Sequence, residues 1–264
     1  LVEHVEVLAS EEATNRCLEQ QQQIYLASDG GAIPGRASYG WILQIGDTQI
    51  ARGKGPTFGD NPRSFRAEGY GMASALVYLQ LIQQQSEFKR DLRSKNTIIC
   101  DNQGLLARIE EAAEWTYTTP YVSLRAECDM ESVILETYQE LGINFTFQHV
   151  KSHQDDETAI RDLSLELRLN VEADRSATAF MIEDQTRRPI VELFHSARAQ
   201  LIIEGASVTR KLPQAIQYAA GSKEIQEYLK TRNPWTEKTL DMISWDAHGA
   251  RYSYHWPQRC YLVK

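Results

Sequence analysis

The chain has 264 residues, of which 42% are hydrophobic and 24% charged, and its formal net charge is −8. This length and composition are typical of one large globular domain, or of one domain with a smaller appendage. No apolar run approaches the length of a membrane span, so we expect no membrane partner. The negative charge lacks the basic footprint of a free-standing nucleic-acid binder. Because the chain begins with Leu1 rather than Met, we expect it to be part of a longer protein.

The cysteines are scattered along the chain at Cys17, Cys100, Cys128 and Cys260, with no Cys-x-x-Cys pair among them. At this length the pattern favours neither a zinc site nor a disulfide framework. We therefore expect reduced thiols and an intracellular protein, either cytoplasmic or nuclear.

Hydrophobic periodicity predicts the elements in chain order. Residues 1–23 are rich in Glu and Gln and are expected to form a linker or an N-terminal helix. A helix is predicted from Ser64, which we expect to cap it. The remaining predicted elements are strands at 24–28, 38–45 and 48–53 with turns at Gly30-Gly31 and Gly46-Asp47, a strand at 96–100, helices at 102–113 and 121–141, a strand at 144–150 and a helix at 163–180. This order predicts an α/β domain over residues 24–183, a mixed five-stranded sheet with flanking helices.

Residues 196–264 have a different pattern and are predicted to form a small α+β extension of unknown role. A hairpin is expected at 200–208, turning at Glu204-Gly205, followed by short helices at 223–230 and 236–245. The basic residues of this extension are spread out among acidic ones, which does not favour a nucleic-acid grip.

Four acidic residues stand at the edges of predicted elements: Asp29, Glu68, Asp101 and Asp174. Asp29 and Asp101 follow short apolar runs that are typical of buried strands. A carboxylate on a buried strand is unfavourable unless something neutralises it. Divalent cations are the best explanation for several such carboxylates together. The pattern therefore predicts metal-assisted phosphoryl chemistry.

The order of the short motifs resembles type 1 ribonuclease H, most closely the domains attached to retroelement reverse transcriptases. The resemblance covers about residues 24–183 and rests on Asp-Gly-Gly, Arg-Ala-Glu, Asp-Asn-Gln, Val-Lys-Ser-His and Asn-x-x-x-Asp, in that order. It implies a ribonuclease H-like fold and hydrolysis of the RNA strand of RNA–DNA hybrids. It also implies a reverse transcriptase domain in the same polyprotein as a partner.

The resemblance further implies a set of catalytic residues. Asp29, Glu68, Asp101 and Asp174 would hold two Mg²⁺ ions, for which Mn²⁺ can substitute, with Asp29 bridging both. His153 matches a histidine that assists proton transfer or product release. A plain surface histidine bonded to Asp155 or Asp156 is the alternative for that position.

Four further positions match residues that contact the hybrid: Gly30, Ser64, Gln103 and Asn170. A turn role for Gly30 and a capping role for Ser64 remain open. Glu166 and Glu172 are extra carboxylates on the last helix. We prefer Asp174 as the ligand, because Ser176, Ala177 and Ala179 after it are small enough to pack close to a sheet.

Three other classes of protein remain as alternatives. The first is a catalytically weak ribonuclease H-like connector or nucleic-acid-binding domain, which is disfavoured because all four carboxylates are present. The second is a transposase or integrase with the same sheet, and the third is an exonuclease of the acidic type. In both of these the acidic residues are arranged differently along the chain.

Overall fold

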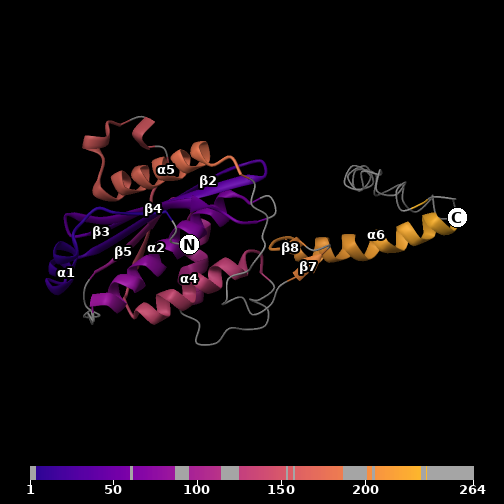
Figure 1. Ribbon diagram of the computed structural model, residues 1–264, viewed down its shortest axis with the longest axis horizontal. Coiled ribbons are helices and arrows are strands. Elements are labelled where there is room, and N and C mark those ends of the chain that lie inside the picture. Colours follow the sequence, from indigo (N-terminus) through magenta and orange to yellow (C-terminus); the bar gives the residue numbers. More distant parts are fainter. Residues whose placement is uncertain are drawn as a thin grey trace. The chain divides into compact units, whose positions relative to one another are not determined.

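The structure is a computed structural model that describes residues 4–59, 62–86, 95–113, 125–152, 154–156, 158–186, 201–203, 206–232 and 236. The chain divides into two units, Leu1–Arg210 and Lys211–Lys264. The first unit holds the six-stranded sheet (Figure 1), and the four acidic residues predicted from the sequence fall within its range.

A mixed sheet forms the centre of the first unit, with the strand order β1-β4-β3-β2-β5-β6. The strands are β1 (Val5–Val7), β2 (Ile24–Ile33), β3 (Arg36–Ile45), β4 (Thr48–Pro56), β5 (Thr97–Cys100) and β6 (Thr146–His149). β5 runs parallel to β2 and to β6, whereas the other neighbours are antiparallel. The predicted α/β fold with a mixed sheet is therefore confirmed.

The sheet has six strands rather than the five expected. The additional strand, β1, lies in residues 1–23, where we expected only a linker or a helix. It pairs with β4 through the register Val5↔Gly53. The helix α1 (Glu11–Glu19) follows it and is capped by the side chain of Ser10.

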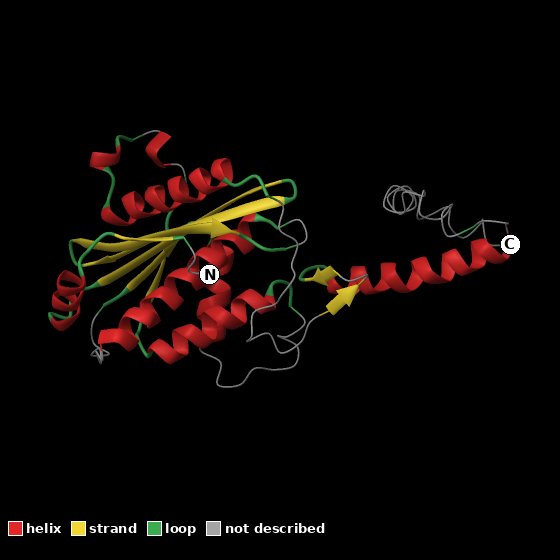
Figure 2. Cartoon of the chain, in the orientation of Figure 1, coloured by secondary structure: helices red, strands yellow, loops and turns green. Residues whose placement is uncertain are grey.

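Helices cover both faces of the sheet. They are α2 (Ser64–Ser86), α3 (Gln103–Ala113), α4 (Cys128–Leu141) and α5 (Leu165–Glu183). Figures 1 and 2 show α2 and α4 on one face of the sheet and α5 on the opposite face. From β2 to α5, the observed order of elements is the predicted order.

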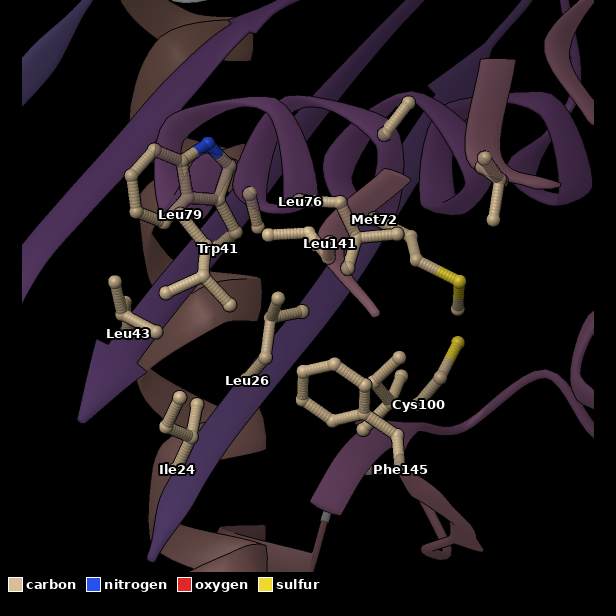
Figure 3. Close-up of a cluster of buried hydrophobic side chains, with 14 of the residues drawn as sticks. Ile24, Leu26, Trp41, Leu43, Met72, Leu76, Leu79, Cys100, Leu141 and Phe145 are labelled. Atoms are coloured by element: carbon tan, nitrogen blue, oxygen red, sulfur yellow. The ribbon is translucent and has the colours of Figure 1, made fainter. Parts of the chain in front are cut away.

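Alternating side chains of the central strands form two buried clusters, one on each face. Leu26 of β2 and Trp41 of β3 belong to the cluster beneath α2, whereas their neighbours Ala27 and Ile42 belong to the cluster beneath α5. Figure 3 shows the first cluster, with Met72 and Leu76 of α2 above the strands. The one polar atom of the buried Trp41 ring is satisfied, since its Nε1 donates to Ser74 Oγ at 2.8 Å.

Glycines bring both helical layers into contact with the sheet backbone. A Cβ atom at Gly40 of β3 would lie 2.2 Å from the carbonyl oxygen of Ala173 on α5. A Cβ at Gly30 of β2 would lie 2.4 Å from the backbone nitrogen of Glu68 on α2. Both helices therefore approach the sheet more closely than any larger residue would permit.

Several local predictions were wrong in detail. β2 does not turn at Gly30-Gly31 but continues to Ile33, because both glycines pair with β3. The chain turns instead beside Gly35, which has the left-handed φ of 78° that favours glycine. α4 begins at Cys128 rather than at residue 121, and residues 121–124 lie outside the described residues.

The C-terminal elements follow the prediction in part. β7 (Leu201–Ile203) and β8 (Ala206–Val208) pair antiparallel, as expected for a hairpin. In the second unit, α6 (Leu212–Arg232) is longer than the helix predicted at 223–230. The helix predicted at 236–245 lies almost wholly outside the described residues. Among the described helices, none has the length and apolar character needed to cross a membrane.

Candidate functional site

Two of the predicted carboxylates lie side by side because their strands are parallel neighbours. The register pairs Ala27 of β2 with Ile99 of β5, and Asp29 and Asp101 each lie two positions further along. Asp29 is buried within β2, while Asp101 is half-buried directly after the end of β5. Strand direction and register therefore place both side chains at one edge of the sheet.

Glu68 reaches the same place from α2. The first turns of this helix lie directly on β2 at Gly30, so the backbone of Glu68 is next to the residue that follows Asp29. Glu68 is buried, and the charges of both Asp101 and Asp29 act on its carboxyl group. Gly30 thus has a packing role here that the sequence did not reveal.

Asn170 and Asp174 come from α5 on the opposite face of the sheet. α5 lies against Gly40, the residue that pairs with Asp29 across β3 and β2. Asn170 is buried and its Nδ2 donates to Asp29 Oδ2 at 3.1 Å. Asp174 is close enough for its charge to raise the pKa of Asp29. By contrast, Glu172 accepts a hydrogen bond from Gln49 on β4, at 2.8 Å.

Hydrogen bonds from neighbouring groups orient the two buried carboxylates. The backbone N–H of Gly30 donates to Asp29 Oδ1 at 2.6 Å. Asn102 Nδ2 donates to Glu68 Oε1 at 3.3 Å, and the thiol of Cys100 donates to Glu68 Oε2 at 3.3 Å. Each carboxylate therefore has a donor on each of its oxygens and a fixed orientation.

The electrostatics show a surplus of negative charge. Burial, followed by the charges of Asp101 and Asp174, raises the pKa of Asp29 to about 8. Burial, followed by the charge of Asp101, likewise raises the pKa of Glu68 to about 8. Both shifts arise from desolvation and from repulsion between like charges, which a bound cation would relieve.

The donor set fits divalent cations. One side-chain atom each of Glu68, Cys100 and Asp101 lie within 4.8 Å of one another in the described part of the chain. Asp101 Oδ1 is buried and has no hydrogen-bond partner among the described residues. Clustered carboxylate oxygens, one of them unsatisfied, are suited to Mg²⁺ or Mn²⁺.

Apart from His153, the remaining predicted site residues differ in burial and in their position on the helices. Ser64 is exposed as the first residue of α2, and Gln103 is exposed as the first residue of α3. Asn170, which we expected to contact substrate, is buried and holds Asp29. His153 lies outside the described residues.

The sequence analysis assigned no role to three residues near the carboxylates: Cys100, Asn102 and Arg66, although Arg66 and Asn102 lie in the Arg-Ala-Glu and Asp-Asn-Gln motifs. Asn102 follows a strand-end aspartate and its Oδ1 accepts from the Leu105 backbone N–H at 3.0 Å, as a helix-capping residue does. That capping pattern was visible in the sequence, but its second bond to Glu68 was not. The partners of Arg66 and Cys100 could not be predicted, because they lie far away in sequence.

Comparisons with known proteins found matches among solved structures but none among protein sequences. No protein-family model and no curated protein sequence matches this chain. Similar solved structures include a ribonuclease H1 termed LC11, crystallised with an RNA/DNA hybrid. It is 15% identical, with a TM-score of 0.44 over 61% of this chain and 98% of that one.

Two further solved structures are similar. The N-terminal ribonuclease H domain of a Mycobacterium tuberculosis protein is 16% identical, with a TM-score of 0.41 over 61% of this chain and 95% of that one. A foamy viral protease–reverse transcriptase with an RNA/DNA hybrid is 12% identical, with a TM-score of 0.40 over 64% of this chain and 21% of that one. Identity this low carries no information about activity.

Proposed function

We propose that this chain hydrolyses the RNA strand of RNA–DNA hybrids with two divalent cations held by Asp29, Glu68, Asp101 and Asp174. One observation carries the proposal. Carboxylates from β2, α2, the end of β5 and α5 act on one another's charge at a single edge of the sheet. A partly buried cluster of like charges of this kind is unfavourable in a metal-free protein and is typical of two-metal phosphodiester hydrolysis.

The residues around the cluster have defined tasks in this proposal. Asn170 and the Gly30 N–H hold the carboxylate of Asp29, while Asn102 and Cys100 hold that of Glu68. Bound Mg²⁺, or Mn²⁺ in its place, would supply an activated water and stabilise the leaving 3′ oxygen. Such fixed orientation lets the ligands accept the cations without rearrangement.

The exposed residues at the starts of α2 and α3 are assigned to the substrate. Ser64 and Gln103 stand at helix N-termini next to the carboxylates, where a polar side chain can reach the sugar and the 2′-hydroxyl. The backbone at Gly30 is a further contact in this proposal. His153 is assigned to proton transfer or product release, because an imidazole changes its charge near neutral pH.

The proposal includes a partner. A net charge of −8 is unfavourable for gripping a hybrid backbone, so the chain needs a source of positive charge in addition to its metal ions. A reverse transcriptase domain in the same retroelement polyprotein is the partner that we propose. The cytoplasm or the nucleus is the proposed compartment, in keeping with the free thiols of Cys17, Cys100 and Cys128.

The test is cleavage of a hybrid labelled on its RNA strand, with Mg²⁺ or Mn²⁺. Single- and double-stranded RNA and DNA serve as substrate controls. We expect cutting of the RNA strand of the hybrid alone, and loss of cutting with EDTA. Cutting of the controls at an equal rate would contradict the proposal. Hybrid binding without cutting by either metal would favour the catalytically weak connector instead.

A further inference from the structure

A second cluster of buried charge is centred on Arg66 of α2, two residues before Glu68. Arg66 is 1% exposed, and its guanidinium donates five hydrogen bonds. The guanidinium forms a bidentate pair with the Asp129 carboxylate, with N···O distances of 2.9 and 2.7 Å, and donates to Glu127 Oε2 at 2.5 Å. The Nε donates to the carbonyl oxygen of Phe58 at 2.6 Å. Arg66 therefore joins α2 both to the chain before it and to the start of α4.

Arg108 of α3 binds the same region of α4. It forms an ion pair with Glu131, and its guanidinium donates to the carbonyl oxygen of Ala126 at 2.8 Å. The guanidinium also lies over the ring of Phe65, 5.0 Å from the ring centre. We call the start of α4 the acidic turn, which comprises Glu127, Asp129 and Glu131. The acidic turn forms ion pairs with one arginine of α2 and one of α3.

The backbone of the acidic turn is itself held in an uncommon conformation. Glu127 has a φ of 63°, in the left-handed region that non-glycine residues rarely adopt. Its N–H donates to the carbonyl oxygen of Thr209 at 2.7 Å, and its side chain accepts from Arg66. Such a conformation persists only where several contacts determine it together.

The acidic turn contacts α2 and α3, and each of these helices contains or follows closely a proposed metal ligand. Glu68 is two residues after Arg66 on α2, and α3 begins two residues after Asp101. Asn102, which caps α3, also donates to Glu68. The spacing between Glu68 and Asp101 therefore depends on how the starts of α2 and α3 are held.

We infer that Arg66 and Arg108, through the acidic turn, are positioning residues that set the spacing of Glu68 and Asp101 for divalent cations. This inference rests on the proposed function, because it assigns the cluster to the same metal ligands. A buried ion pair contributes little net stability compared with apolar packing, so stability alone does not account for an arginine with five bonds at this place. Groups that orient metal ligands commonly change metal affinity by about 10- to 100-fold.

The test compares Arg66→Lys with Leu79→Ala in the full chain. Lysine keeps the positive charge but cannot form the bidentate hydrogen bonds to Asp129. Leu79 is buried on the same helix, about 16 Å along its axis from Glu68 by helix geometry, so its truncation lowers stability without touching the cluster. We expect Arg66→Lys to weaken Mn²⁺ binding, measured by electron paramagnetic resonance, by about tenfold. Leu79→Ala should bind Mn²⁺ as the wild type does.

Amide hydrogen exchange without metal gives a second readout. Arg66→Lys should speed exchange at the first turns of α2 and α3, whereas Leu79→Ala should speed it in the second half of α2 only. Wild-type Mn²⁺ affinity in Arg66→Lys, or unchanged exchange at both helix starts, would overturn the inference. A wild-type protein that binds Mn²⁺ but cleaves no hybrid would instead contradict the proposed function.

Discussion

Two clusters of buried charge lie two residues apart on α2, and they differ in how their charge is compensated. Around Arg66, a guanidinium is matched by the carboxylates of Glu127 and Asp129 with short hydrogen bonds. Around Glu68, the charges of neighbouring carboxylates raise the pKa of Glu68 and Asp29, and both side chains accept hydrogen bonds from neutral donors: Gly30, Cys100, Asn102 and Asn170. The first cluster contains its own cation, whereas the second is where we propose that divalent cations bind.

The contrast shows why buried charge alone does not identify a functional site. Burial raises the pKa of Asp29 and Glu68 because nothing at the site favours their charged forms strongly enough. Burial alone would lower the pKa of Arg66, but the hydrogen bonds that Arg66 donates to Asp129 outweigh it, and the pKa of Arg66 is raised. Buried like charges without an opposite charge indicate a candidate ligand site. Buried charges that are paired with opposite charges indicate a structural or positioning role.

The largest expected effect comes from breaking the matched cluster. Replacing Arg66 by Met leaves Glu127 and Asp129 buried without their cation. The free energy of unfolding should fall by about 3–5 kcal/mol, as for other buried pairs that lose one partner. Urea denaturation measures the change. Adding Asp129→Leu should recover part of the loss, and an Arg66→Met protein as stable as the wild type would show that the cluster is not matched as described.

The second prediction concerns the pH dependence of the metal-free protein. The pKa of Asp29 and of Glu68 is about 8 in the fold, above their ordinary values of 3.8 and 4.5. The folded state therefore binds more protons than the unfolded state between about pH 4 and pH 8, and stability falls as pH rises through this window. A loss on the order of a few kcal/mol is expected between pH 5 and pH 8.

Urea titrations at several pH values measure this trend. Saturating Mn²⁺ should reduce the slope, because a bound cation stabilises the ionised ligands. Stability that rises with pH over the same range in the metal-free protein would contradict the assignment of unmatched charge.

The third prediction is a rise in the free energy of unfolding, where the first is a fall. Asp29→Asn removes one of the repelling charges and keeps the shape of the side chain. It should stabilise the metal-free fold at pH 8 by on the order of 2 kcal/mol, with little effect at pH 4. Thermal unfolding at both pH values measures the difference. Destabilisation at pH 8 would indicate that Asp29 is already compensated.

The smallest effect is expected at an exposed ion pair. Arg52 and Glu6 join β4 to β1 at 2.7 Å, but both side chains are about half exposed. Arg52→Ala should lower the free energy of unfolding by about 0–1 kcal/mol, because solvent and salt screen such pairs. A loss as large as that of Arg66→Met would remove the distinction between buried and exposed pairs.

Much of the fold was predictable because it depends on local periodicity. The apolar runs before Asp29 and Asp101 gave their strands, and the helical spacing after Ser64 gave α2. β1 was missed because a strand of three residues, two of them exposed, has no periodic signal, and only its pairing with β4 defines it. The turn misplaced at Gly30-Gly31 has a similar cause, since the contact of Gly30 with α2 is tertiary.

The sequence predicted a cluster of carboxylates but not the residues that surround them. The ends of apolar runs and the start of a helix predicted Asp29, Asp101 and Glu68, whereas Asp174, in the middle of α5, was predicted from the resemblance. Arg66 and Asp129 lie 63 positions apart, so no local pattern links them. Likewise, Cys100 and Glu68 are brought together only by the packing of α2 on the sheet.

The most direct measurement compares hybrid cleavage by the wild type, Asp101→Asn and Asp47→Asn, with Mn²⁺ binding measured in the same preparations. Asp47 is an exposed turn residue and serves as the matched control. Asp101→Asn should reduce cleavage about 100-fold or more, weaken Mn²⁺ binding and keep the fold, whereas Asp47→Asn should match the wild type in all three. Full cleavage by Asp101→Asn would contradict the assignment of this cluster as the metal-dependent active site.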